Sequence, residues 1–221
     1  MNENPNPNAQ WPTKFERPFY APSPMAMPIV FENIFNPYEC DQIIEYIEDH
    51  PDYYQPGKVG VSRHPDDPSG LQEDVRNVDT IPVQMHFHDQ LMNEIWQKIN
   101  YAVYEINRQN FQFEILHCQQ MELAKYSPPG GKYVEHVDCG ATEASTMRKL
   151  SFSVQLNDPD SFDGGKLTFS KASMGIGESE QKKIPQGAIV VFPSFLVHSV
   201  EPVTEGTRYS MFGWFDGPRF K

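Results

Sequence analysis

The sequence is poor in cysteine and has no long apolar run. Its 221 residues include 3 cysteines, Cys40, Cys118 and Cys139, and no Cys-x-x-Cys pair. An odd, scattered set of this kind does not build a disulfide framework and suits a reducing compartment. No segment approaches the roughly 18 consecutive apolar residues of a transmembrane helix, and the opening MNENPNPNAQWPTKF has neither the basic region nor the apolar run of a secretory signal. We therefore expect a soluble, cytoplasmic protein.

Basic residues are also scarce. Lysine and arginine number 18 against 30 aspartates and glutamates, which gives a formal net charge of -12 at pH 7. Such a surface repels nucleic-acid phosphates and anionic membranes unless a local basic patch overrides the net charge. The largest cationic clusters are the pairs Arg148-Lys149 and Lys182-Lys183, and single pairs are usually solvated. The charge pattern predicts neither a nucleic-acid nor a membrane partner.

The composition predicts an N-terminal arm followed by one domain. Residues 1–28 are rich in proline and asparagine and have no hydrophobic period, which is typical of an extended arm. Residues 29–221 are enough for a single domain with a sizeable core, and 38% of the chain is hydrophobic. We divide this domain into supporting helices and strands at 29–110 and a β-rich core at 111–221.

Two helices are predicted in the supporting part. Asn36 as N-cap, Pro37 at the first helical position and Glu39 three residues after the cap predict a helix at about 37–49. Apolar residues at helical spacing predict a second helix at about 87–107. Both helices precede the β-rich core in the chain.

The segment between these helices is rich in turn residues. Residues 55–74, QPGKVGVSRHPDDPSGLQED, predict a long loop. Loops of this length are uncommon unless they are lids or disordered, so this loop is a candidate lid. The run RNVDTIPV at 76–83 predicts a strand.

From Phe111 onward, short β-type runs alternate with turn signals such as SPPGG, DPDSFDGG and TEGT. The runs are FQFEILHCQQMELAKY, YVEHVD, KLSFSVQLND, KLTFS, IPQGAIVVFP, LVHSVEPV and RYSMFGWFD. About seven strands without intervening helices predict an antiparallel sandwich or barrel. The fold class is therefore α+β, with helices first and a double-sheet β core second.

Three His-x-Asp triplets stand out as candidate metal-binding pairs: His50/Asp52, His64/Asp66 and His136/Asp138. About one His-x-acid triplet is expected by chance from the composition, so the triplet alone decides nothing. The first two enclose a proline in turn-rich segments, which favours solvated turn residues. His136 and Asp138 follow an alternating run, and residues two apart on a strand project to the same face. This pair can therefore reach one ion.

A third ligand and an anion-binding residue follow later in the chain. His198 lies among apolar strand residues, as a metal ligand or as a satisfied core histidine. Two histidines and one carboxylate form the facial triad of non-haem Fe(II) oxygenases. Arg208 opens the aromatic strand RYSMFGWFD, and a carboxylate in bidentate geometry would satisfy its guanidinium. The alternatives are an arginine that points to solvent or one that pairs with an internal aspartate.

The order of these motifs resembles a known family. Tyr126-SPPGGK-Tyr133-VE-His136-V-Asp138 is followed by RKLSFSVQLND at 148–158, GGKL at 164–167, PQGAIVVFPSFLVHSVEPV at 185–203, and Arg208 through Trp214. This series is similar to the 2-oxoglutarate and Fe(II)-dependent dioxygenases, and within them to the prolyl 4-hydroxylase-like branch with its bacterial and phage members. The similarity is strong over about 112–216 and looser over 30–110.

The resemblance implies a double-stranded β-helix, or jelly roll, with N-terminal helices packed on one sheet. It implies that His136, Asp138 and His198 are catalytic iron ligands. It also implies that Arg208 and Tyr126 bind the distal carboxylate of 2-oxoglutarate.

Other aromatic and polar positions of the motif have lesser roles by the same resemblance. Tyr133 and Trp214 match the pattern as supporting residues. Gln155 replaces a tyrosine that some relatives carry at this strand position, which leaves its contact with the co-substrate open.

The activity implied is hydroxylation of a peptidyl or free amino-acid side chain, with proline first among the candidates. Fe(II), 2-oxoglutarate and O2 would be required, with ascorbate (vitamin C) as a candidate reductant, and succinate and CO2 would be released. The partner would be a peptide, a protein or an amino acid. Two alternatives stay open: a non-redox, cupin-like metal-binding module, and a nucleic-acid-oxidising member of the same superfamily.

Overall fold

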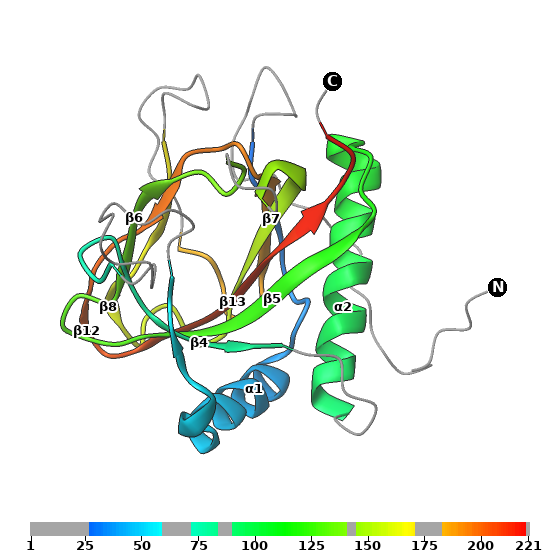
Figure 1. Ribbon diagram of the computed structural model, residues 1–221. Helices are drawn as coiled ribbons and strands as arrows, with labels where there is room; N and C mark the ends of the chain where they lie inside the picture. The colour runs from blue at the N-terminus through cyan, green and yellow to red at the C-terminus, as the bar shows by residue number, and fades with distance from the viewer. Residues whose placement is uncertain (1–26, 59–71, 84–89, 141–144, 171–182, 220–221) are drawn as a thin grey trace.

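The computed structural model describes residues 27–58, 72–83, 90–140, 145–170 and 183–219, and its elements are shown in Figure 1. Residues 1–26 of the predicted arm and 59–71 of the candidate lid lie outside the described residues. None of the described helices combines the length and the apolar character that a membrane span requires.

The larger of the two main sheets has seven antiparallel strands in the order β1-β10-β7-β13-β5-β4-β2. Long strands occupy its centre, and the two edges are short. The strands are β1 (Ile29–Phe31), β10 (Ile189–Pro193), β7 (Arg148–Gln155), β13 (Arg208–Asp216), β5 (His117–Tyr126), β4 (Asp79–Pro82) and β2 (Gln55–Pro56).

The smaller sheet has four strands in the order β3-β6-β11-β9. These are β3 (Arg76–Asn77), β6 (Lys132–His136), β11 (His198–Val200) and β9 (Leu167–Phe169), and a separate pair is formed by β12 (Val203–Glu205) and β8 (Asp163–Gly164). Phe169 and Val200 of this sheet share one buried cluster with Ala124 and Phe192 of the larger sheet. The predicted double-sheet jelly roll is therefore confirmed.

The helix α1 (Pro37–Asp49) has the predicted bounds and the predicted capping box. The Asn36 side chain accepts a hydrogen bond from the Glu39 backbone N–H at 3.0 Å, and the Glu39 carboxylate accepts one from the Asn36 N–H at 2.9 Å. Both donors would otherwise lack a partner at the helix start. This start was predictable because the whole motif lies within four consecutive residues.

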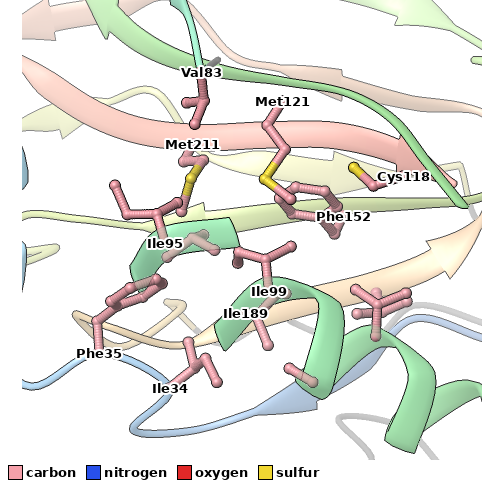
Figure 2. Close-up of a cluster of buried hydrophobic side chains, with 14 of the residues drawn as sticks. Ile34, Phe35, Val83, Ile95, Ile99, Cys118, Met121, Phe152, Ile189 and Met211 are labelled. Carbon is pink, nitrogen blue, oxygen red and sulfur yellow. The ribbon is translucent and has the colours of Figure 1, made fainter. Parts of the chain in front are cut away.

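The helix α2 (Gln90–Ile106) covers the outer face of the larger sheet (Figure 1). Figure 2 shows Ile95 and Ile99 of this helix directed at Met121 and Met211 of the sheet, within one buried cluster. A π-helical turn (Asn107–Phe111) continues the helix. Residues 84–89, which include the predicted helix start at 87, lie outside the described residues.

The larger sheet is buried on both faces, because successive side chains of its strands belong to different buried clusters. In β10, Ile189 and Val191 belong to the cluster under the helices, whereas Val190 and Phe192 belong to the cluster between the sheets. Successive side chains of a strand point to opposite faces, so a continuous apolar run is required here. The apolar run IVVF in the sequence therefore reflects a strand that is buried on both faces.

Several predicted strand boundaries are wrong. The run LVHSVEPV at 196–203 is not one strand, because β11 ends at Val200 and β12 begins at Val203. The segment 76–83 is not one strand, because β3 and β4 belong to different sheets and separate at Val78, which is buried between the sheets. β5 begins at His117 and not near residue 111, since the π-helical turn occupies 107–111. The strands β1, β2 and β8 were not predicted, because two or three residues are too few to show an alternation.

Candidate metal centre

Three of the predicted site residues converge at one end of the smaller sheet. His136 ends β6, His198 begins β11, and the two are direct partners in the antiparallel register. Asp138 follows β6 by two residues, and its carboxylate oxygens lie 3.5 Å from Nε2 of His136 and 3.4 Å from Nε2 of His198. In the described part of the chain, this is the one group of three such residues whose ligand atoms all lie within 4.8 Å of one another.

Backbone hydrogen bonds orient both imidazoles toward this point. Nδ1 of His136 lies 2.8 Å from the carbonyl oxygen of Val134, and Nδ1 of His198 lies 2.9 Å from that of Leu196. A carbonyl oxygen can only accept, so in each neutral ring Nδ1 carries the proton and Nε2 presents its lone pair. Outer hydrogen bonds of this kind fix the tautomer of metal-binding histidines.

The Asp138 carboxylate is buried, and its charge is stabilised by its surroundings. Burial acts to raise the pKa of Asp138, but the neighbouring His198 and His136 outweigh it and hold this pKa well below its usual range. The loop that carries Asp138 is fixed as well, since its backbone N–H donates to the Ser194 carbonyl at 2.9 Å. Arg148 donates to the Asp138 carbonyl at 3.3 Å. The site therefore presents an ionised carboxylate beside the two Nε2 atoms.

Aromatic rings enclose the histidines. The Tyr133 ring stacks on the His136 ring, with centroids 3.5 Å apart and an interplanar angle of 17°. Phe192 packs edge-on against His198, with centroids 4.7 Å apart. Burial raises the pKa of Tyr133 to about 12. The rings restrict the imidazoles to one orientation and exclude water from one side of the cluster.

Arg208 is a buried cation on β13 of the larger sheet, which faces the cluster's sheet. It is 2% exposed, its Nε donates to Oε1 of Gln155 at 3.1 Å, and its Nη1 donates to the Ser210 hydroxyl at 3.3 Å. Burial lowers the pKa of Arg208, and Tyr126 partly offsets this effect. Among the residues that the structure describes, no carboxylate forms an ion pair with Arg208. An anion from outside the protein would satisfy this charge.

One cavity joins the cluster to Arg208. Its volume is about 40 Å³, and its lining includes the three clustered residues together with Tyr126 and Arg208. A larger cavity of about 500 Å³ adjoins it, since Arg76, Tyr133, His136, Asp138 and Trp214 line both. An ion held by the cluster would thus face both the cavity at Arg208 and the larger cavity.

Two arginines in the lining were not predicted as site residues. The guanidinium carbon of Arg148 lies 3.7 Å from the centre of the Trp214 ring. That of Arg76 lies 5.0 Å from the centre of the Tyr133 ring. Arg148 was expected to be solvated as part of a cationic pair, but it is half-buried and Lys149 is 5% exposed. The rings that receive both arginines lie on other strands, so local sequence gave no signal.

Among the other candidate histidines, His50 is described by the structure, and it is not part of this cluster. Nδ1 of His50 lies 2.8 Å from the Tyr46 carbonyl, and the His50 ring stacks on Tyr46 and Tyr53. It is a half-buried packing residue and not a fully solvated one. The second His-x-Asp triplet, at 64–66, lies outside the described residues. Cys139, beside the cluster, is half-buried.

The sequence of the β core matches known proteins. The model of the 2OG-Fe(II) oxygenase superfamily matches residues 121–216. A PKHD-type hydroxylase of Prochlorococcus marinus is 40% identical over 88 residues, which is 40% of this chain and 38% of that protein. One of Hyphomonas neptunium is 35% identical over 100 residues, which is 41% of this chain and 43% of that protein. The chain thus spans about two fifths of the length of these curated relatives.

Solved structures match over more of the chain. A Pseudomonas putida prolyl-4-hydroxylase superposes with a TM-score of 0.66 at 19% identity and covers 86% of this chain and 92% of its own. A prolyl hydroxylase of Trichoplax adhaerens, solved with a peptide fragment of hypoxia inducible factor, gives 0.67 at 14% identity, with 86% and 83% covered. These likenesses establish the fold. Together with the match at 121–216, they confirm the resemblance that the motifs indicated.

Proposed function

We propose that this protein is an Fe(II)- and 2-oxoglutarate-dependent dioxygenase that hydroxylates a peptidyl or free amino-acid side chain, with proline as the first candidate. One observation carries the proposal. A His-Asp-His cluster and a buried arginine without a described carboxylate partner line the same cavity. The first fits a metal ion and the second fits an organic anion beside it.

His136, Asp138 and His198 would hold the iron. Two imidazoles and one carboxylate leave coordination positions open for further ligands, which suits Fe(II) in oxygenases. Bound iron would supply the activation of O2 needed to hydroxylate the substrate and to convert 2-oxoglutarate to succinate and CO2. The protein contributes the fixed Nε2 lone pairs and an Asp138 carboxylate that stays ionised at neutral pH.

Arg208 and Tyr126 would hold the distal carboxylate of 2-oxoglutarate. A guanidinium buried without a carboxylate is costly, and an incoming carboxylate removes that cost. Burial raises the pKa of Tyr126, and Arg208 only partly offsets this, so the phenol keeps its proton and can donate a hydrogen bond. A metal-binding module without a co-substrate has no use for such a pair of donors.

The adjoining cavity would hold the substrate. Its volume of about 500 Å³ has room for a side chain together with neighbouring peptide groups. A peptide substrate is further supported by the Trichoplax prolyl hydroxylase of similar fold, which was solved with a peptide. His136 and Asp138 also line this cavity, so a substrate there lies next to the candidate iron site.

Two measurements test the proposal. Anaerobic addition of Fe(II) and 2-oxoglutarate together should produce a visible absorption band that neither produces alone. In air, the wild type should release succinate above a His136→Ala control, and mass spectrometry of a peptide and amino-acid library should detect a product that has gained one oxygen. Absence of both the absorption band and the succinate would refute the proposed dioxygenase activity. Succinate with oxygen gain on a substrate other than proline would refute only the proline assignment.

A further inference from the structure

We propose that Gln155 is a positioning residue that sets the affinity and selectivity for the distal carboxylate of the co-substrate, by holding Arg208 with an uncharged acceptor. The inference rests on the proposed function, because it concerns the pocket assigned there to 2-oxoglutarate. It goes beyond that function in giving a role to a side chain that replaces a tyrosine of some relatives.

The two side chains are in direct contact, and both are buried. Oε1 of Gln155 accepts a hydrogen bond from Nε of Arg208 at 3.1 Å, and the two residues are 4% and 2% exposed. They lie on neighbouring strands of the larger sheet, with Gln155 at the end of β7 and Arg208 at the start of β13. The rotation of the guanidinium plane is fixed because Nε donates to Gln155 while Nη1 donates to Ser210.

The orientation of the Gln155 amide is forced by its other partners. Its Nε2 donates to the backbone oxygen and to Oδ1 of Asn157, both at 3.0 Å. Arginine offers only donors and a carbonyl oxygen only accepts. The amide therefore has to turn its oxygen to Arg208 and its nitrogen to Asn157, so the acceptor cannot flip away.

Asn157 ties this arrangement to the backbone on both sides of Arg208. Its Oδ1 accepts from the Tyr209 N–H at 2.8 Å, and its Nδ2 donates to the Thr207 carbonyl at 2.9 Å. The residues before and after Arg208 are thus bonded to the same asparagine that holds Gln155. Gln155 and Arg208 belong to one closed hydrogen-bonded frame, and a shift of either side chain would break bonds in it.

The missing charge on Gln155 is as important as its hydrogen bond. Its amide and the Ser210 hydroxyl are both neutral acceptors, so they orient the guanidinium without neutralising it. A glutamate at position 155 would have nearly the same shape, but it would supply an internal counter-ion for Arg208 and would lose both bonds that Nε2 donates to Asn157. The charge of Arg208 would then be neutralised within the protein, and a dicarboxylate would lose its advantage over a monocarboxylate.

The test compares two ligands on three variants. Glutamate and leucine replace Gln155 in Gln155→Glu and Gln155→Leu. Gln119→Glu is the matched control, because Oε1 of Gln119 accepts from Nε of Arg148 at 2.7 Å, which gives the same contact and the same added charge away from Arg208. 2-Oxoglutarate and 2-oxobutanoate are titrated anaerobically into the Fe(II)-loaded proteins. Both ligands are 2-oxo acids, but only the first has a distal carboxylate.

We expect Gln155→Glu and Gln155→Leu to weaken 2-oxoglutarate binding by about tenfold or more, the size of one charge-assisted hydrogen bond. 2-Oxobutanoate binding should change less than about twofold, within the range of an ordinary surface substitution, and Gln119→Glu should leave both ligands unaffected. Unchanged 2-oxoglutarate binding in Gln155→Glu, or an equal loss for both ligands, would overturn the inference. If Gln155→Leu does not fold, the near-isosteric glutamate variant decides alone. Failure of the wild type to prefer 2-oxoglutarate would instead refute the proposed function.

Discussion

Arg208 and Tyr126 are direct partners in the register of β13 and β5, and the guanidinium carbon lies 5.1 Å from the centre of the Tyr126 ring. This pairing brings the start of one long strand beside the end of another. Both residues line the cavity that also contains the His-Asp-His cluster. The two side chains that are proposed to donate hydrogen bonds to the co-substrate carboxylate therefore lie on paired strands of the antiparallel sheet. Neither residue lies in a loop.

The first prediction removes one of these donors. Tyr126→Phe should raise the dissociation constant of 2-oxoglutarate about 10- to 100-fold, because a hydrogen bond to a charged group contributes about 1.5 to 3 kcal/mol. The maximal rate should be kept, since the ring still fills its buried position. Tyr104→Phe is the control, because its exposed hydroxyl donates to the Leu116 carbonyl and neither residue lines either cavity. Equal affinity in both variants would show that Tyr126 does not bind the co-substrate.

The sequence predicted those parts of the molecule whose causes are local. The capping box of Asn36 and Glu39 lies within four residues, and α1 has the predicted bounds. Strand alternation predicted that His136 and Asp138 reach one point, and they do, although Asp138 lies two residues beyond the end of β6. By contrast, the break at Val78 follows from its burial between two sheets, which no pattern in RNVDTIPV reveals.

The site could be anticipated only in part, for the same physical reason. His198 and Arg208 were identified from unusual residue types within apolar or aromatic strands and from the order of motifs. The roles of Arg76 and Arg148 depend on the Tyr133 and Trp214 rings, which are supplied by other strands. Contacts of this kind exist only after the sheets have paired, so they had to be found in the structure. The assignment of iron and 2-oxoglutarate to these residues stays a prediction.

A second prediction concerns alkaline pH and a buried thiol. Burial raises the pKa of Cys40 from 9.0 to about 12. The unfolded chain therefore loses this proton first as the pH rises. The contribution of Cys40 to stability is intact below pH 9 and falls by up to about 1.4 kcal/mol per pH unit between 9 and 12. Cys40→Ala should flatten the decline in the free energy of unfolding between pH 8 and 10.5, measured by urea denaturation.

Ile43→Val is the control for this thiol. It lies on the same helix, is fully buried and also loses volume, but it carries no titrating group. It should be destabilised by about 1 kcal/mol at every pH and should keep the slope of the wild type. If Cys40→Ala showed the same slope as Ile43→Val, Cys40 would not be a source of the alkaline instability.

A third prediction tests two glycines with left-handed backbone. Gly187 has a φ of +74°, and a Cβ added there would lie 1.9 Å from the Phe35 carbonyl oxygen. Gly130 has a φ of +89°, with nothing within 4 Å of such a Cβ. Gly130→Ala should cost only the backbone strain, about 1 to 2 kcal/mol. Gly187→Ala adds a steric clash and should cost about 2 to 5 kcal/mol. Equal urea midpoints for the two variants would contradict this comparison.

The last prediction separates two of the His-x-Asp triplets by their metal binding. His136→Ala removes one of three ligand atoms that lie within 4.8 Å of one another and should abolish stoichiometric iron binding. His50→Ala alters a triplet of the same sequence pattern, but its ring hydrogen-bonds to Tyr46 and stacks between two tyrosines. It should keep the iron and lose only packing stability, about 1 kcal/mol.

Metal analysis after anaerobic reconstitution and desalting measures the iron, and thermal unfolding with and without Fe(II) measures the coupling of binding to folding. Iron should stabilise the wild type and His50→Ala but not His136→Ala, because a ligand that binds only the folded state shifts its stability by mass action. Loss of iron from both variants would mean that the close approach of His136, Asp138 and His198 is not what selects the metal.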